Sequence, residues 1–300
     1  MEKLYLLHFA TPGTRVSPFD VNMAYDAGWN AVIPYSGVGL EDIAGFTQDA
    51  IFSRGPKGAK RTGIFIGGRD PMLAAGMLDA ARKAMVPPFE VSVFADPSGA
   101  FTTAAAMIAA VEKALAGTHG STLAGRRVTV FGGTGPVGMI AAVLAAQAGA
   151  EVTIPGHDGL FRAQSAAEAI QARFGVTIRP IDASSDDAKA ALIADTEVAL
   201  ATAKAGVQVL GPAHLAHAAR LMVAADINAV PPAGIEGIGV MDDGKPFAAA
   251  SGHAVGIGPL AIGNIKYKVQ QGLLQAMLRT DSPLYLGFAD CLREARLHAA

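Results

Sequence analysis

The chain has 300 residues, 51% of them hydrophobic, and its 24 basic and 26 acidic residues leave a net charge of −2. This length and apolar content predict a large core in one or two domains. The even charge balance, with no long basic run, argues against a nucleic-acid groove or an anionic membrane surface as a partner.

The cysteine count and the N-terminus indicate where the protein works. A single cysteine, Cys291, excludes an internal disulfide, and no cysteine–histidine cluster has zinc spacing, so no metal site is predicted. The first residues read as a strand and lack the long apolar core of a signal peptide. Polar residues interrupt the Ala-rich helical segments before the length needed to cross a bilayer. We therefore expect a soluble, cytoplasmic protein.

Short β-rich runs alternate along the chain with longer Ala-rich runs of helical spacing. In chain order, the predicted strands are 4–9, 31–34, 62–66, 91–95, 127–131, 152–154, 176–180, 198–202 and 222–227. The predicted helices are 20–27, 41–51, 71–85, 102–116, 137–148, 161–174, 186–193, 214–221, 260–278 and 284–298. This alternation predicts an α/β protein with parallel sheets covered by helices on both faces.

The domain division follows from a small polar linker at 116–121. We predict a first α/β domain formed by 1–117 plus 268–300, because the final helices are expected to return to it. Residues 118–267 are predicted to form a Rossmann-type domain. The two α/β lobes would then enclose an interdomain cleft, where ligands of such proteins bind.

The stretch Gly133-Thr134-Gly135-Pro136-Val137-Gly138 matches G-x-G-x-x-G between an apolar strand and a predicted helix. That context makes the motif a strong indication of a dinucleotide site. Gly133 would allow the tight turn, Gly135 would let the backbone approach a pyrophosphate, and Gly138 would let helix and sheet pack closely. Pro136 suits the first helical position, where a missing N–H is harmless. The alternative is a glycine turn that binds nothing.

The residues after the second strand of this domain usually select the cofactor, an acid favouring NAD and an arginine favouring NADP. This chain has His157 and Asp158 there, with Arg162 a turn further on. Because an acid and an arginine both follow the strand, the predicted cofactor is NAD or NADP. His157 has an equal alternative as a solvent-facing turn residue.

Several longer segments carry a resemblance to a known family. They are Ser17–Met23, Asp49–Arg54, Arg61–Gly68, Phe94–Gly99, Gly133–Gly138, Asp226–Ile235 and Gly256–Lys266. Together they resemble the NAD(P)-dependent methylenetetrahydromethanopterin dehydrogenases of methylotrophic bacteria, which act in one-carbon (formaldehyde) oxidation. The resemblance implies a homo-oligomer whose subunit binds the cofactor on the second lobe and the pterin in the cleft. A sister enzyme, specific for NADP, has an arginine where this chain has His157, which favours the branch that uses both cofactors.

The implied reaction takes a hydride from a carbon between two pterin nitrogens and leaves a delocalised methenyl cation. No general base is needed at that carbon, so the site must align the reactants and tolerate a growing positive charge. Asp20 is a candidate to stabilise the cation, and its alternative is a helix N-cap. The resemblance places a functional lysine at Lys266, with a solvated helix lysine as the alternative and Lys268 as a competitor. The Tyr-x-x-x-Lys motif of related folate dehydrogenases is absent from the sequence.

Most of the further candidates lie where predicted strands end, the usual place for ligands in α/β proteins. Phe19 instead adjoins Asp20, and Gly256 and Gly258 would allow the backbone to approach a ligand closely. For the cofactor they are Thr202, Ala203, Lys204 and Asn228. For the substrate they are Phe19, Asp96, Pro97, Ser98, Gly99, Thr102, Thr103, Gly256 and Gly258. Helix capping by Thr102, ordinary turns at 202–206 and a tight turn at 256–258 are the alternatives.

The sequence is compatible with other functions as well. A methylenetetrahydrofolate dehydrogenase would differ only in its substrate, and a redox sensor would bind the dinucleotide without turnover. A shikimate- or alcohol-type dehydrogenase would need a proton-shuttling pair, and the sequence offers none at convincing spacing.

Overall fold

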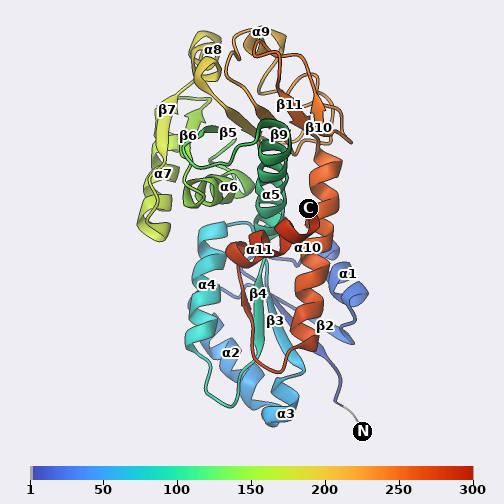
Figure 1. Cartoon of the computed structure of the whole chain (residues 1–300). Coiled ribbons are helices and arrows are strands. Elements are labelled where there is room, and N and C mark those ends of the chain that lie inside the picture. Colours follow the sequence, from blue (N-terminus) through green and yellow to red (C-terminus); the bar gives the residue numbers. More distant parts are fainter. Residues whose placement is uncertain (1–2, 300) are drawn as a thin grey trace. The chain divides into compact units, whose positions relative to one another are not determined.

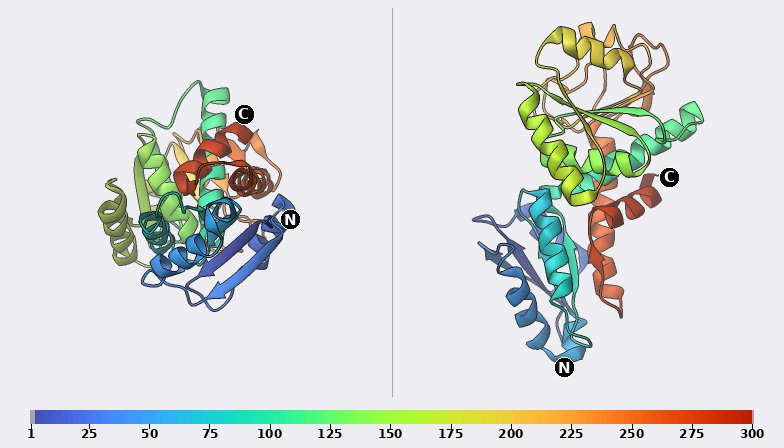
Figure 2. Two further views of the ribbon diagram at one scale, coloured as in Figure 1. Left: turned by 90° about the horizontal axis from the view of Figure 1, so that it is seen from below. Right: turned by 90° about the vertical axis from the view of Figure 1, so that its left-hand side faces the viewer.

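The computed structural model describes residues 3–299 and divides into two compact units. The first contains the chain up to Thr102 together with Tyr267–Ala295, and the second contains Thr103–Lys266 and the residues from Arg296 onward. The chain passes between the units inside three helices, which are α5 (Ala100–His119), α10 (Pro259–Arg279) and α11 (Phe288–Ala299). Each unit contains a sheet of mainly parallel strands with helices packed against it, so the predicted α/β class is confirmed (Figures 1 and 2).

The sheet of the first unit has the order β12-β4-β3-β1-β2 and is parallel throughout. Its strands are β1 (Leu6–Thr11), β2 (Ala31–Ser36), β3 (Thr62–Ile66), β4 (Ser92–Ala95) and β12 (Tyr285–Leu286). Helices α2 (Ile43–Phe52), α3 (Gly55–Ala59) and α4 (Pro71–Lys83) lie on one side of it, and α1 (Pro18–Ala27) and α10 lie on the other (Figure 1). The central strands are buried on both faces, which explains their continuous apolar sequence.

The sheet of the second unit has the order β10-β11-β9-β8-β5-β6-β7. Its strands are β5 (Arg127–Phe131), β6 (Glu151–Gly156), β7 (Arg179–Asp182), β8 (Val198–Ala201), β9 (Val223–Asp226), β10 (Asp243–Pro246) and β11 (Val255–Ile257). From β7 to β11 the strands are parallel and follow the 3-2-1-4-5-6 order of a Rossmann sheet, and β10 adds an antiparallel edge.

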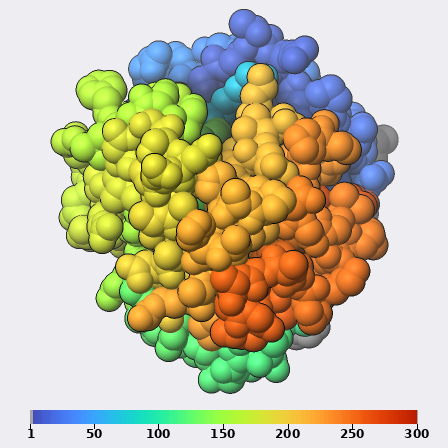
Figure 3. All heavy atoms as spheres, turned by 90° about the horizontal axis from the view of Figure 1, so that it is seen from above, coloured from blue at the N-terminus to red at the C-terminus, as the bar shows by residue number. Residues whose placement is uncertain are grey.

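Helices cover both faces of this second sheet. On one face lie α6 (Pro136–Gln147) and α7 (Leu160–Phe174), and on the other lie α8 (Asp186–Asp195) and α9 (Pro212–Leu215) (Figure 1). Figure 3 looks onto the α8 and α9 side, where yellow and orange segments hide the strands. The core on this side is apolar and includes Ile193, Ala199, Leu215 and Leu221.

Two predicted helices differ from the structure. The predicted helix at 214–221 is wrong beyond Leu215, because bonds such as His217 N–H to the His214 carbonyl (2.9 Å) tighten the chain into turns before β9. The helix predicted at 284–298 begins only at Phe288 in the structure, as α11 (Phe288–Ala299). The preceding residues Tyr285–Leu286 form a strand that pairs with β4.

Within residues 3–299, one helical stretch qualifies by length and hydropathy as a membrane span, contrary to the prediction that polar residues interrupt the helical segments before that length. It is Pro97–His119, and 78% of its most apolar window is buried inside the protein. A buried helix of this kind belongs to a protein core, because its apolar side chains are already covered.

Candidate active site

The glycine turn of the second unit connects the end of β5 at Phe131 to the start of α6 at Pro136. Gly132, which the motif does not include, has the left-handed φ of 78°. A Cβ at Gly132 would lie 2.6 Å from the Ala203 nitrogen, and one at Gly138 would lie 2.5 Å from Thr202 Oγ1. The turn therefore packs directly against the chain that leaves β8, and only glycine fits these two positions.

Gly135 differs from its neighbours in the turn. Its φ of −87° and ψ of 166° are open to any residue, and it serves as the N-cap of α6. Within the described chain, a Cβ there would meet only the Gly132 carbonyl oxygen, at 3.3 Å. Contacts inside the protein therefore require glycine at Gly132 and Gly138. At Gly135 they leave room for a larger side chain. The space beside Gly135, at the positive end of a 12-residue helix, suits a phosphate.

The remaining residues of the motif lie in or beside the same turn, but the left-handed φ predicted for the tight turn at Gly133 is found at Gly132. Pro136 is exposed at the first position of α6, and Thr134 and Val137 are half-buried beside it. Gly133 is buried, and a Cβ there would lie 2.7 Å from Ile154 of β6. Gly133 therefore keeps the turn close to the neighbouring strand.

The segment between β6 and α7 carries charges of both signs. Arg162 Nη1 lies 3.2 Å from Asp158 Oδ2, and His157 Nδ1 lies 3.8 Å from Asp158 Oδ1. All three side chains are solvent-exposed. The hydrogen bond from Arg162 lowers the pKa of Asp158, with His157 contributing. An acid and a cation therefore stand together at the position that selects between NAD and NADP.

The turns after β8 and β9 meet beside the glycine turn. Thr202 Oγ1 donates to the Phe131 carbonyl at 2.8 Å, Ala203 is half-buried and Lys204 is exposed. The Asn228 side chain accepts from Gly206 N–H at 3.1 Å and donates to the Pro232 carbonyl at 2.7 Å. The Asn228 amide therefore connects the turn after β8 to the loop after β9 by hydrogen bonds.

A buried carboxylate that the sequence analysis did not single out supports this loop. Asp226 is 1% exposed and accepts from Asn228 N–H at 2.8 Å and Ile235 N–H at 3.1 Å. Burial raises the pKa of Asp226, against the lowering effect of these backbone donors. The Pro231–Pro232 peptide within the loop is cis.

In the first unit, Asp20 lies in the first turn of α1. Ser17 is the N-cap, because its hydroxyl accepts from Asp20 N–H at 3.4 Å. The alternative that Asp20 itself caps the helix is therefore wrong. The Asp20 side chain is 4% exposed and accepts from Gln270 Nε2 of α10 at 2.6 Å. The neighbouring Phe19 ring is 48% exposed.

The two candidate lysines occupy different faces of α10. Lys266 is half-buried and lies one turn before the fully buried Gln270, so that both share a helix face. Lys268 is exposed to solvent. Of the two, Lys266 lies on the face that reaches Asp20 through Gln270.

The segment after β4 is held by its own hydrogen bonds. Asp96 is fully buried and accepts from Phe101 N–H at 2.9 Å, Thr102 N–H at 3.2 Å and Thr102 Oγ1 at 2.6 Å. Asp96, rather than Thr102, thus binds the free N–H groups at the start of α5. Ser98 has a φ of 52° and donates to the Gly68 carbonyl at 2.7 Å. Pro97 and Gly99 are buried beside it, and Thr103 is half-buried.

Gly256 and Gly258 make close contacts with the chain itself. A Cβ at Gly258 would lie 2.1 Å from the Gly239 carbonyl oxygen, and one at Gly256 would lie 2.9 Å from Ile238. The tight packing of the 238–240 loop is thus sufficient to explain both glycines.

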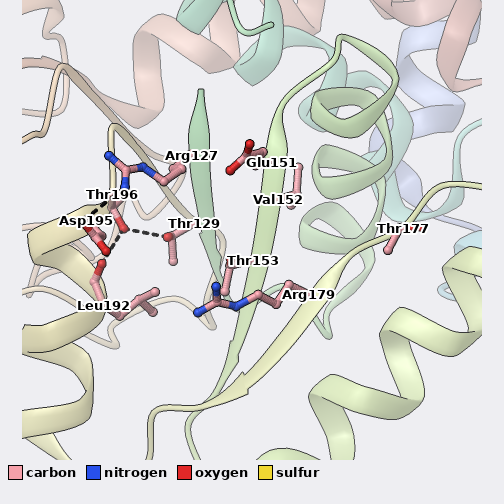
Figure 4. A pocket seen from close by; sticks show the side chains of 10 residues that line it. All are labelled: Arg127, Thr129, Glu151, Val152, Thr153, Thr177, Arg179, Leu192, Asp195 and Thr196. Atoms are coloured by element: carbon pink, nitrogen blue, oxygen red, sulfur yellow. Dashed lines mark hydrogen bonds and ion pairs between the residues drawn. The ribbon is translucent and has the colours of Figure 1, made fainter. Parts of the chain in front are cut away.

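A pocket of about 220 Å³ lies at the opposite end of the second sheet, where β5, β6 and β7 begin (Figure 4). Its lining residues are Arg127, Thr129, Glu151, Val152, Thr153, Thr177, Arg179, Leu192, Asp195 and Thr196. None of them belongs to the candidate site, which lies at the carboxyl ends of the strands. Within residues 3–299 no group of three or more His, Cys, Asp or Glu side chains could hold a metal.

A Rossmann-ordered sheet, with a glycine turn from its first strand into a helix, defines a dinucleotide-binding protein of the dehydrogenase type. Solved structures share this fold. The quinate dehydrogenase of Corynebacterium glutamicum in complex with NAD aligns with a TM-score of 0.52 and 13% identity, covering 97% of this chain and 98% of that one. The NAD-dependent malic enzyme of Thermotoga maritima aligns with a TM-score of 0.58 and 12% identity, covering 99% and 85%.

Sequence comparison narrows this class to one family. The profile described as methylene-tetrahydromethanopterin dehydrogenase, N-terminal, matches residues 18–98. The NAD(P)-dependent methylenetetrahydromethanopterin dehydrogenase of Methylorubrum extorquens is 47% identical over 290 residues, covering 97% of both chains. The bifunctional protein MdtA of the same organism is 33% identical over 285 residues, covering 95% of this chain and 96% of its own. The chain belongs to the methylenetetrahydromethanopterin dehydrogenase family.

Proposed function

We propose that this protein catalyses the reversible oxidation of methylene- to methenyl-tetrahydromethanopterin with NAD⁺ or NADP⁺, in one-carbon oxidation. The observation that carries the proposal is 47% identity extending over 97% of a relative with that name. The glycine turn supports it independently, because its geometry suits a dinucleotide phosphate.

The electrons balance without a protein base. The hydride would leave the methylene carbon with the electron pair of the broken C–H bond. The nicotinamide, which the residues of the glycine turn would hold, would accept it. A lone pair on a flanking pterin nitrogen replaces the lost electrons and creates the N–C–N cation. No proton leaves the carbon, so the protein's task is alignment and charge stabilisation.

The dinucleotide is assigned to the second unit. When the dinucleotide is bound, its nicotinamide ring supplies the hydride acceptor. The N-terminus of α6 and the backbone beside Gly135 would hold the pyrophosphate. Asp158 suits an adenosine ribose diol, whereas Arg162 and His157 suit a 2′-phosphate. Because one segment carries both kinds of group, we expect the protein to accept both cofactors.

The pterin is assigned to the first unit, which carries Asp20 and Phe19. Asp20 would stabilise the forming cation, since its carboxylate is buried and is not consumed as a helix cap. Lys266 would orient the pterin by donating hydrogen bonds to its polar edge. The Phe19 ring, 48% exposed beside Asp20, offers an aromatic surface for the substrate.

The test is a rate assay that crosses methylene-tetrahydromethanopterin and methylene-tetrahydrofolate with NAD⁺ and NADP⁺, followed at the nicotinamide absorbance band. The proposal expects turnover of the methanopterin substrate with both cofactors. Turnover of the folate alone would make the protein a folate dehydrogenase. Tight dinucleotide binding without turnover of either pterin would make it a redox sensor.

The assembly and location form part of the same proposal. We expect a cytoplasmic homo-oligomer, as the family resemblance implies. Light scattering on the purified protein and fractionation of the source cells measure these two properties directly.

A further inference from the structure

Asp20 and Gln270 form a buried polar pair between α1 and α10 of the first unit. Asp20 is 4% exposed and Gln270 is fully buried. Gln270 Nε2 lies 2.6 Å from Asp20 Oδ1, although 250 residues separate them in the chain. Burial of a carboxylate is costly unless donors satisfy it, so the amide of Gln270 contributes to keeping Asp20 inside the protein.

The identity of the donor matters for the proposed chemistry. A carboxylate that stabilises a forming cation must keep its negative charge and face one direction. An arginine in place of Gln270 would fix the carboxylate but also neutralise it. A glutamine amide fixes one carboxylate oxygen by a directional bond and adds no charge.

The position of Gln270 on α10 gives a second argument. It lies four residues after Lys266, so the amide and the lysine share one helix face. The neighbouring Gln271 differs, because its Oε1 is buried and finds no hydrogen-bond partner within the described chain. Of these two adjacent glutamines, Gln270 is the one whose amide donates to the Asp20 carboxylate.

We propose that Gln270 is a positioning residue for hydride transfer, which holds the Asp20 carboxylate in the orientation that stabilises the methenyl cation. The inference rests on the proposed function. It adds a residue whose effect on the reaction passes through Asp20.

A double-mutant cycle tests this coupling. The variants are Gln270→Leu, Asp20→Asn and the double variant, assayed for kcat and for the KM of the nicotinamide cofactor. Loss of a hydrogen bond to a charged group predicts a roughly 10- to 100-fold lower kcat for Gln270→Leu, with cofactor KM changed less than about threefold. In the Asp20→Asn background the same substitution should cost less than about twofold, because the partner charge is already gone.

Two further variants separate positioning from folding. Gln270→Glu keeps the side-chain shape but opposes two carboxylates, so kcat should fall at least as far as in Gln270→Leu. Gln271→Leu is the matched control and should leave kcat unchanged. Melting temperatures and NAD(P) affinity show whether each variant is folded.

The outcomes are distinguishable. Equal losses from Gln270→Leu in both backgrounds would overturn the proposal, and so would wild-type kcat in Gln270→Leu. If turnover of Asp20→Asn is too slow to measure, the same cycle is run on the dissociation constant of the methenyl product, whose cation the carboxylate faces. A wild-type protein that turns over no methylene-pterin would instead refute the proposed function itself.

Discussion

Gly135→Val is the sharpest test of the dinucleotide site, because the structure predicts lost binding with a retained fold. The backbone at Gly135 already lies in the extended region that valine prefers. The new Cβ would meet only the Gly132 carbonyl oxygen at 3.3 Å, within the described chain. Valine is a poorer N-cap than glycine, so we expect a loss of about 1 kcal/mol or less in unfolding free energy.

The effect on binding should be much larger. The valine side chain would occupy the space where a pyrophosphate approaches the N-terminus of α6. Losing two backbone N–H bonds to a charged phosphate, at about 1.5 kcal/mol each, weakens binding by about 3 kcal/mol. This corresponds to a roughly 100-fold higher Kd for NAD and NADP alike.

The assay is an equilibrium fluorescence titration with each reduced cofactor, paired with thermal unfolding. Gly132→Ala is the matched control, since its φ of 78° and a Cβ 2.6 Å from the Ala203 nitrogen should destabilise the fold by at least ~2 kcal/mol. Unchanged cofactor affinity in Gly135→Val would refute the placement of the phosphate.

Three further predictions concern single side chains. Asp20→Ala should lower kcat ~100-fold with little change in cofactor Kd, because the carboxylate acts on the substrate cation; wild-type turnover would leave Asp20 a structural partner of Gln270. Arg162→Ala should raise the KM for NADP at least ~10-fold and spare NAD, in parallel rate assays; equal losses would contradict a phosphate-binding role. Burial raises the pKa of Glu197, but the Arg127 N–H and the Arg126 guanidinium outweigh it and lower the pKa below 4.5. Glu197 therefore stabilises the fold above that pH, and the contribution is lost as pH falls through the folded pKa. The melting-temperature deficit of Glu197→Gln should shrink as the pH falls through the lowered folded pKa, and a constant deficit would disprove this account.

The sequence by itself determined the α/β class and most of the elements. Strands and helices have different apolar periods, which are local properties, so ranges such as Thr62–Ile66 and Arg127–Phe131 were predicted to the residue. The glycine turn could also be predicted from the sequence, because a strand, a turn and a helix follow one another directly in the chain.

Only the tertiary structure decided the features that depend on distant partners. The strands β10, β11 and β12 are two to four residues long and carry no period of their own; each exists because a neighbouring strand offers free backbone groups. Gly132 lies outside the motif, and its need for glycine appears only when Ala203 packs against it. The sequence pattern does not distinguish Gln270 from other polar residues of the predicted helix at 260–278. Folding gives it a role, because it brings the amide 2.6 Å from a carboxylate 250 residues away and removes water from both.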